Sequence, residues 1–518
     1  MSTPKLEANP GMTKENVEAF EKLAKGSYYL ILDNVVNLSL GALFWIVLAK
    51  MVDAAPLGQA MVAIAFATSV IGFAGFGVQV TISKFVSEYN ARGMPRASRR
   101  VLSLGIRLAL IVSASVAVVI ALLSEYIATE AYGDSSMSTL LMLSVLTFLP
   151  SQTVVSALMG AYQGSHKMKY ALLSDSVYQV IRLGLAVFLV LASFSAFGIV
   201  MSFAVASVIA SVLGFVYFVP RLFDRQVSAY DHASPQDKNE VRGLRQILKF
   251  SGHNYAAIGM KTLTAQIGVL IVGTQNFELA AFYGLSVLIS NLVGGILNAV
   301  SRALLPTASE EWTRGNKMGL TQTLDTGVRL SMLISGIGFL VLFVQPGAVL
   351  GLISEEYVEA SFALRILVVA SMIYSLGLIL TSMLNAANRA AEVAKIGVVS
   401  SGITIVLTFI LTPLFDIEGA AIALLAGSIA GLYMSMSGLK AKENITISAR
   451  AALKPAIAMV IGAAVAFVSA MFIPNTIVSL ALGLLVYGAI SLGWRVTTRK
   501  EIRMLVSIMR KQRSPGNE

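Results

Sequence analysis

The sequence predicts an all-α polytopic membrane protein with about fourteen transmembrane helices. Of its 518 residues, 56% are hydrophobic and only 13% are charged, whereas soluble domains carry about a quarter charged residues. Continuous apolar runs follow one another along the chain, and each is long enough to cross a hydrocarbon core of about 30 Å. Outer-membrane strands alternate polar and apolar residues over about ten positions, and these runs do not. The composition therefore argues against a water-soluble enzyme and favours a helical membrane protein.

The apolar runs define the individual spans. They lie near residues 27–52, 57–83, 99–123, 137–164, 169–194, 197–219, 246–273, 278–305, 318–345, 360–387, 390–412, 417–438, 453–473 and 476–495. Residues 1–25 form a polar, partly amphipathic segment without the apolar core of a signal peptide. Residues 496–518 form a basic tail that starts with a helix-capping pattern. We expect both terminal segments on the cytoplasmic side.

Charges between the spans predict the orientation of the chain. Basic residues gather in every second connection, and acidic residues gather in the others. The basic set is Lys84, Arg92, Arg96, Arg99, Arg100, Lys167, Lys169, Arg314, Lys317, Lys440, Lys442 and Arg450. Because cytoplasmic loops carry the excess of Lys and Arg, we expect both termini in the cytoplasm and an even number of spans.

Two halves of the sequence match at one constant spacing. Gly72 corresponds to Gly294, and the stretch 105–108 (GIRL) corresponds to 327–330 (GVRL). We call the spacing between Gly72 and Gly294 the repeat register. At a slightly larger spacing, 158–164 resembles 383–389. Since each half holds six spans, the repeats are parallel and related by a pseudo-two-fold axis along the membrane normal.

This repeat predicts a division of the chain into lobes. We expect an N-lobe at 26–219, a cytoplasmic linker at 220–245, a C-lobe at 246–439 and an appended pair of spans at 440–495. Two such bundles facing each other enclose a central cavity, and rocking them opens it to alternate sides.

Several classes of site are disfavoured by residue content. The chain has no cysteine, and its three histidines share no i, i+4 spacing, so thiolate chemistry is excluded and a histidine metal site is not expected. It contains no Gly-Lys dipeptide, which rules out a Walker A phosphate loop. We attribute the net charge of +11 to loops facing anionic lipid rather than to nucleic acid. We expect no enzyme, no metal and no bound cofactor.

Charged residues at membrane depth are the strongest candidates for function, because burying a charge there costs at least about 2.5 kcal/mol. We expect Lys261, Arg182, Arg107 and Arg329 to line a cationic cavity that accepts phosphate. The structural alternative is that Asp325 pairs with Arg329, that Asp175 neutralises Arg182 and that Arg107 reaches the headgroups.

Other polar residues are weaker candidates. Asp33 and Asp175 are candidates to couple transport to Na⁺ or H⁺, and the alternative for Asp33 is to accept hydrogen bonds from headgroup hydroxyls. Six amides are expected along the substrate path, although they serve equally well as bonds between helices: Asn34, Asn37, Asn254, Gln266, Asn291 and Asn298. Two pairs with i, i+4 spacing, Glu88 with Arg92 and Glu310 with Arg314, are expected to form a cytoplasmic gate, and a solvated helix end explains them equally well.

Short motifs in the first half carry a family resemblance. The stretch 76–79 (FGVQ) followed by 84–89 (KFVSEY), the stretch 160–164 (GAYQG) and the arrangement of six, six and two spans resemble the polysaccharide-export flippases. These belong to the multidrug/oligosaccharidyl-lipid/polysaccharide exporter superfamily. The resemblance covers residues 20–495 and is looser for substrate than for family.

The resemblance implies a flippase for a lipid-linked oligosaccharide. The substrate would carry a polyprenyl phosphate or pyrophosphate and would cross the cytoplasmic membrane of a prokaryote by alternating access, for assembly of a surface polysaccharide or glycan. We expect a monomer that contacts membrane lipids and glycan-assembly enzymes. The alternative is a cation-coupled multidrug exporter of the same superfamily.

Overall fold

The computed structural model describes residues 32–34, 36–75, 77–222, 244–473 and 475–494. Within these residues the chain is mainly helical, with short turns between helices, and contains no strand, as the continuous apolar runs predict. The predicted terminal segments 1–25 and 496–518 lie outside the described residues, as does most of the linker 220–245.

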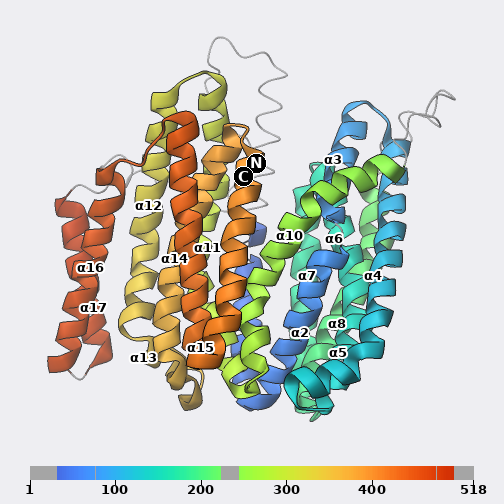
Figure 1. Ribbon diagram of the computed structural model, residues 1–518, viewed down its shortest axis with the longest axis horizontal. Coiled ribbons are helices and arrows are strands. Elements are labelled where there is room, and N and C mark those ends of the chain that lie inside the picture. The colour runs from blue at the N-terminus through green and yellow to red at the C-terminus, as the bar shows by residue number, and fades with distance from the viewer. Residues whose placement is uncertain (1–31, 35, 76, 223–243, 474, 495–518) are drawn as a thin grey trace, which may run out of the picture.

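Two bundles of long helices stand side by side (Figure 1). The N-lobe begins with the span Leu32–Ala49 and continues through α2 (Ala54–Ala74), α3 (Val78–Ala91), α4 (Pro95–Tyr132), α5 (Ser136–Leu143), the π-helical turn η1 (Ser144–Phe148), α6 (Leu149–Gly164), α7 (Met168–Leu191), α8 (Ser195–Leu213) and the π-helical turn η2 (Gly214–Phe218).

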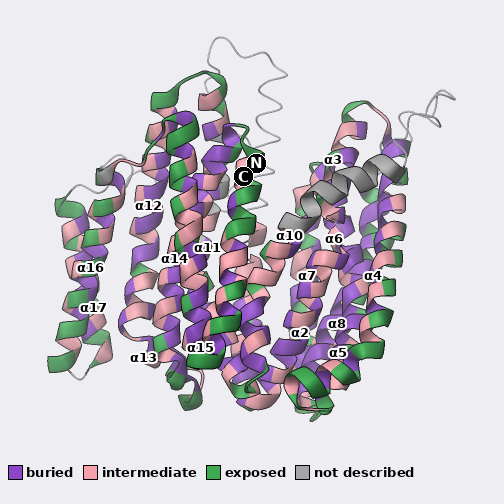
Figure 2. Ribbon diagram, in the orientation of Figure 1, coloured by how far each residue is buried: buried purple, intermediate pink, exposed green. Residues whose placement is uncertain are grey.

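The C-lobe contains α10 (Leu244–Gly273), α11 (Phe277–Thr313), α12 (Lys317–Val344), α13 (Pro346–Gly351), η4 (Glu355–Ala360), α14 (Ser361–Ala386) and α15 (Ala390–Glu443). The helices α16 (Ala449–Phe472) and α17 (Thr476–Gly493) form an outer hairpin. The hairpin packs on α12, where the Tyr487 hydroxyl donates to the carbonyl oxygen of Leu333 at 2.9 Å. Figure 2 shows buried residues inside both lobes and exposed residues along the outer faces, including that of the hairpin.

The number of membrane spans is twelve by helix length and composition within the described residues. Two features bear on this number. The helix α15 is interrupted by non-helical dihedral angles at Phe415 and Asp416, just after Pro413, and α10 holds a shorter apolar stretch at Ile258–Gly273. If α15 crosses twice and α10 crosses once, the total is fourteen, so that count stays a prediction.

The structure supports the internal repeat through the positions of its helix ends. The helices α3 and α11 end at Ala91 and Thr313, and α7 and α15 begin at Met168 and Ala390. Both pairs are spaced in the repeat register. After the first pair, Gly93 and Gly315 take φ angles of 72° and 70°, the left-handed conformation that ends a helix.

The structure also corrects the spacing of the second match. His166 and Asn388 both adopt positive φ, 55° and 63°. The amides of the next residues, Lys167 and Arg389, reach back to the carbonyl oxygens of Tyr162 and Leu384 at 3.0 and 2.9 Å. These equivalent turns keep the repeat register, so the larger spacing proposed for 158–164 and 383–389 is wrong. Apolar sequence similarity misplaced the match by close to one helical turn, because residues separated by about one turn lie on the same helix face.

The two lobes touch along α2, which packs on α10 and α11, and this contact reaches the end of the bundle that holds the acidic connections. We call it the acidic end, and the opposite end, with the turns at 92–94, 165–167, 314–316 and 387–389, the basic end. At the acidic end α2 packs on α11. Gly58 lies so close that a Cβ there would overlap the carbonyl oxygen of Phe277, and Tyr132 stacks on Phe277 with ring centroids 6.1 Å apart.

Candidate functional site

A cavity of about 510 Å³ lies between the first span of the N-lobe and four helices of the C-lobe. We call it the central cavity. Asn34, Asn37 and Leu38 form its N-lobe wall, and α10, α11, α14 and α15 form the rest. Its polar lining consists of Asn34, Asn37, Lys261, Thr264, Tyr283, Asn291, Asn298, Ser371, Tyr374, Ser400, Ser401, Thr404 and Ser428. A polar space therefore lies where the first span of the N-lobe meets the C-lobe.

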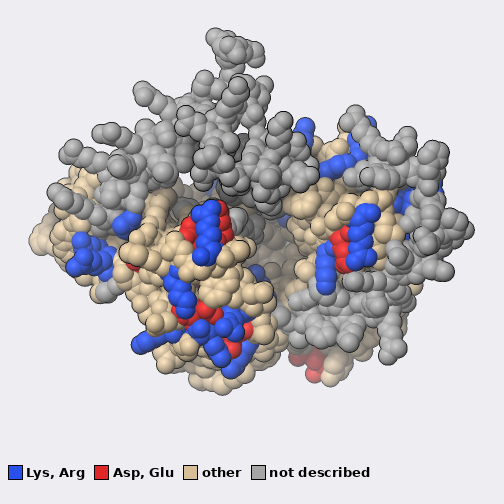
Figure 3. Space-filling view, turned by 90° about the horizontal axis from the view of Figure 1, so that it is seen from above, with Lys and Arg blue, Asp and Glu red and all other residues tan. Residues whose placement is uncertain are grey.

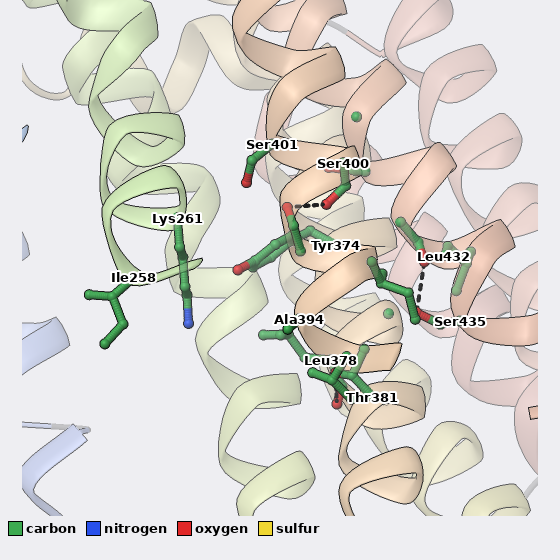
Figure 4. A pocket seen from close by; sticks show the side chains of 17 residues that line it. Ile258, Lys261, Tyr374, Leu378, Thr381, Ala394, Ser400, Ser401, Leu432 and Ser435 are labelled. Atoms are coloured by element: carbon green, nitrogen blue, oxygen red, sulfur yellow. Dashed lines mark hydrogen bonds between the residues drawn. The ribbon is translucent and has the colours of Figure 1, made fainter. Parts of the chain in front are cut away.

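A second cavity, of about 270 Å³, lies inside the C-lobe among α10, α14 and α15 (Figure 4). We call it the side cavity. It shares six lining residues with the central cavity: Lys261, Tyr374, Ser400, Ser401, Gly427 and Ser428. The side cavity is therefore a branch of the central one.

Lys261 stands where the two cavities meet. It is the one charged residue among the described residues that line either cavity. Its side chain extends away from α10 (Figure 4) and is exposed. An ammonium group in this place attracts an anion, and its flexible stem lets it follow a moving phosphate.

The two predicted carboxylates meet inside the N-lobe, joined by an amide. The Asn37 side chain donates to Asp33 Oδ1 at 3.3 Å and to Asp175 Oδ2 at 3.0 Å. Gln179, one turn beyond Asp175, donates to Asn37 Oδ1 at 2.7 Å. Since Asn37 also lines the central cavity, this network connects the carboxylates to the cavity wall.

Arg182 lies in the N-lobe core and is absent from the walls of both cavities. It is 6% exposed, and its guanidinium carbon is 4.1 and 4.5 Å from the ring centroids of Phe44 and Phe203. Its Nε and Nη2 atoms have no hydrogen-bond partner. The faces of these rings stabilise the guanidinium cation. Arg182 was predicted to contact phosphate in a cavity, and in the structure it contacts aromatic rings instead.

The other predicted side chains are spread over the molecule. Arg107 is exposed on the face of α4 that also carries Ile111, and Arg329 is half-buried on α12. Neither lines the two cavities, and neither does Gln266 of α10. Asn34 and Asn291 do line the central cavity. The side chain of Asn254 lies outside the described residues.

Both predicted gate pairs form ion pairs at the basic end. Arg92 is 2.9 Å from Glu88, and Arg314 is 2.5 Å from Glu310. Viewed from this end, basic and acidic side chains lie together on each lobe, with a depression between the lobes (Figure 3). In the present conformation each arginine is thus paired within its own lobe.

Sequence reasoning missed the hydroxyl groups that line the cavities, above all Ser400, Ser401 and Thr404 of α15. Serine and threonine are frequent in membrane helices, so their presence alone carries little signal. Their spacing does carry one, because residues at i, i+1 and i+4 share one side of a helix.

Two family profiles match more than half of the chain each. The first, described as polysaccharide biosynthesis protein, matches residues 23–312, and the second, described as lipid II flippase MurJ, matches residues 204–487. Stage V sporulation protein B of Bacillus subtilis (strain 168) is 23% identical over 433 residues, which are 79% of this chain and 82% of that protein.

Solved structures share the fold. A structure of the lipid II flippase MurJ in an inward closed conformation has a TM-score of 0.72 at 14% identity, over 91% of this chain and 99% of that one. An inward-facing multidrug resistance MATE transporter of the MOP superfamily has a TM-score of 0.64 at 14% identity, over 79% of this chain and 99% of that one.

Proposed function

Because the chain belongs to the polysaccharide biosynthesis protein family and matches the lipid II flippase family as well, we propose that it moves a lipid-linked oligosaccharide across the membrane. It is a multi-pass membrane transporter of the flippase type. The substrate we propose carries a polyprenyl phosphate or pyrophosphate and serves the assembly of a surface polysaccharide or glycan. The proposed site of action is the cytoplasmic membrane of a prokaryote, with both termini in the cytoplasm and the protein acting as a monomer beside glycan-assembly enzymes.

The observation that carries this proposal is the central cavity with Lys261 on its wall. A charged, hydroxyl-rich headgroup crosses hydrocarbon slowly because its phosphates and hydroxyls would lose their water. The amides and hydroxyls of the cavity replace that water, and Lys261 supplies one positive charge for the phosphate. The hydrocarbon tail stays in the bilayer, between the lobes.

The conformation supports transport by alternating access. The lobes are in contact at the acidic end, through Gly58 and Phe277, whereas the ion pairs at the basic end remain within their own lobes. In a two-fold interface, when one residue of the first half meets a residue of the second half, the two equivalent residues also meet each other. In the opposite state we therefore expect Arg92 to meet Glu310 and Arg314 to meet Glu88, which closes the predicted cytoplasmic gate.

Two sources of energy are compatible with this site. An anionic headgroup that leaves a negative-inside cell gains about 2.3 kcal/mol per charge for each 100 mV. Alternatively, Na⁺ or H⁺ binds between Asp33 and Asp175, which Asn37 holds close together. Binding would change the charge of the network, and Asn37 would pass this change to the cavity wall.

The carboxylate pair also favours a second candidate function, which is cation-coupled export of drugs. A cationic drug needs acidic groups in its binding cavity, and Asp33 and Asp175 are joined to the central cavity through Asn37. Lys261 on the wall opposes a cationic substrate. A deletion strain that becomes sensitive to drugs while its surface glycan is unchanged would support this alternative.

The test of the proposed flippase uses purified protein in liposomes that contain a fluorescent polyprenyl-diphosphate oligosaccharide. We expect the lipid to reach the opposite leaflet faster than in protein-free vesicles, as measured by its accessibility to an impermeant quencher. Lys261→Ala should slow this exchange about tenfold, because a hydrogen bond to a charged group contributes about 1.5–3 kcal/mol.

The matched control for this test is Lys454→Ala. Lys454 donates to the carbonyl oxygen of Trp494 at 3.1 Å, in the outer hairpin and away from both cavities. Its variant should exchange the lipid at the wild-type rate. Exchange no faster than in protein-free vesicles would refute the proposed function, and equal rates for Lys261→Ala and the wild type would refute the role of Lys261.

A further inference from the structure

The side cavity of the C-lobe has a wall chemistry that differs from that of a simple phosphate site. Four hydroxyls of its wall donate to carbonyl oxygens of their own helices: Thr381 to Leu378 at 3.0 Å, Ser400 to Gly397 at 3.2 Å, Ser428 to Leu424 at 2.7 Å and Ser435 to Gly431 at 2.7 Å. A hydroxyl has one proton and two lone pairs. With the proton used, each of these side chains is left as an acceptor.

The small residues that line the side cavity belong to the C-lobe copy of the repeat. In the repeat register, Gly427, Gly431 and Ser435 of α15 correspond to Val205, Ile209 and Leu213 of α8. The N-lobe thus has larger residues at these three sequence positions than the C-lobe has. On the facing segment of α15, a Cβ at Gly397 would meet no atom within 4 Å, so this part of the cavity is open space.

We infer that the side cavity is a sugar subsite, which binds a monosaccharide unit of the substrate through its hydroxyl donors while the attached phosphate stays beside Lys261. This inference rests on the proposed flippase function. Sugar hydroxyls supply the donors that an acceptor wall requires, whereas phosphate oxygens supply none. Leu378, Val393, Ile396 and Leu432 contribute the apolar part of the wall and suit the C–H faces of a sugar ring.

Lys261 fixes the orientation of the bound unit. It lines both cavities, so a phosphate beside its ammonium group lies at their junction. The sugar then enters the side cavity, and the prenyl tail extends from the central cavity toward the bilayer. A lipid with a phosphate and no sugar would use Lys261 alone and leave the hydroxyl wall unoccupied.

The first test compares two lipids in the same liposomes: a polyprenyl-diphosphate disaccharide and the polyprenyl phosphate without sugar. Gly397→Leu fills the side cavity and should slow the glycosylated lipid about tenfold or more relative to the unglycosylated one, since a polar site that loses its ligand contacts discriminates strongly. Thr381→Val removes one acceptor at constant shape and should slow it about threefold to tenfold. The matched controls are Gly402→Leu and Thr408→Val, because Gly402 is also open at its Cβ and Thr408 donates to Thr404 at 2.8 Å outside both cavities.

The two lipids separate the possible outcomes. If Gly397→Leu and Thr381→Val slow both lipids equally, or slow the unglycosylated lipid more, the side cavity serves the lipid or the conformational cycle and the inference is overturned. If the wild-type protein moves neither lipid, the proposed flippase function fails instead.

A second measurement tests sugar binding in the side cavity directly, and it requires neither a transport assay nor the Gly397→Leu variant. Because the chain has no cysteine, Thr381→Cys introduces a single thiol into the side cavity. A soluble disaccharide should slow maleimide labelling of this thiol, and inorganic phosphate should not. If the labelling rate of Thr381→Cys is the same with and without the disaccharide at every concentration used, the inference is overturned.

Discussion

The two lobes follow the same chain path but present opposite chemistry on equivalent helices. The helices α7 and α15 begin at positions related by the repeat register, after turns with the same hydrogen bonds. In this register Asp175, Tyr178, Gln179 and Arg182 of the N-lobe correspond to Gly397, Ser400, Ser401 and Thr404 of the C-lobe. One face of the same helix is thus filled by charged and aromatic side chains in one lobe and left open, with hydroxyls, in the other.

The lobes also differ in helix regularity. The N-lobe contains two π-helical turns, η1 and η2, and the described part of the C-lobe contains none. The helix that follows η1 and the helix that precedes η2 are joined by hydrogen bonds. The Ser151 and Ser207 hydroxyls lie 2.5 Å apart, and Ser211 donates to the carbonyl oxygen of Ser151 at 3.1 Å. π-Helical turns often mark functional positions within helices. We therefore expect the N-lobe to change shape during transport more than the C-lobe does.

This comparison teaches that one repeat can divide two tasks between its copies. The N-lobe holds the carboxylate pair that we propose binds a cation, and the C-lobe holds the lysine and the hydroxyls that we propose bind phosphate and sugar. Separate tasks predict separate defects, so variants in the two lobes should have distinguishable effects on transport.

The largest effect is expected when the flipping rates of Asp175→Asn and Lys261→Met are compared in the liposome assay, with and without an ion gradient. Asp175→Asn keeps the shape of the network but removes one charge beside Asn37. We expect it to abolish the response of the flipping rate to a Na⁺ or H⁺ gradient, a loss of about tenfold or more, because a hydrogen bond to a charged group contributes about 1.5–3 kcal/mol. Lys261→Met should weaken substrate affinity and keep the response to the gradient. Identical defects in both variants would break the division between the lobes.

A smaller effect is expected for Arg182 in thermal unfolding of the purified protein. Its Nε and Nη2 atoms lack partners inside the N-lobe, and a buried charge of this kind costs stability. Arg182→Met fills the same space without charge and should unfold at the wild-type temperature or a few degrees higher. Arg182→Ala should unfold at a lower temperature, because a cavity among Phe44, Tyr178 and Phe203 costs about 2–5 kcal/mol. A large loss of stability in Arg182→Met would show that the charge itself holds the N-lobe together.

The smallest effect is expected at the turns that precede α7 and α15. Lys167 donates to the carbonyl oxygens of Arg221 and Leu222 at 3.0 and 3.1 Å, whereas Arg389 pairs with Glu443 at 2.8 Å. The Glu443 side chain is 4% exposed, so Arg389→Met strands a buried carboxylate and should destabilise by about 1–3 kcal/mol. Lys167→Met leaves only carbonyl groups at a helix end and should cost about 0.5–1 kcal/mol. Comparable unfolding temperatures for the two variants would remove this difference between the lobes.

Much of the fold was predictable because membrane helices are recognised in a sequence by the length and apolarity of their residue runs. The predicted span 169–194 corresponds to α7 at Met168–Leu191, and the predicted span 318–345 to α12 at Lys317–Val344. The span predicted at 99–123 is longer in the structure, where α4 runs from Pro95 to Tyr132. Its last turns are more polar than a membrane span, but their backbone groups still form helical hydrogen bonds, so hydropathy alone ends the helix too early.

The candidate site was predictable only in part. Five residues were identified as polar at membrane depth and do line the central cavity: Lys261, Asn34, Asn37, Asn291 and Asn298. Arg182 was identified by the same rule and lies in the aromatic core of the N-lobe instead. Depth along a helix can be read from the sequence, but the direction of a side chain depends on which neighbour packs against that face.

By itself the sequence determined the class of the protein, its repeat and the residues too costly to bury without a purpose, because these follow from transfer free energies and periodicity along one chain. The tertiary structure alone decided that Asn37 joins Asp33 to Asp175, that Arg182 sits between aromatic rings and that small residues of α15 leave a cavity. Those facts depend on contacts between segments far apart in the sequence, such as Asn37 and Asp175, and packing between helices is what brings such segments together.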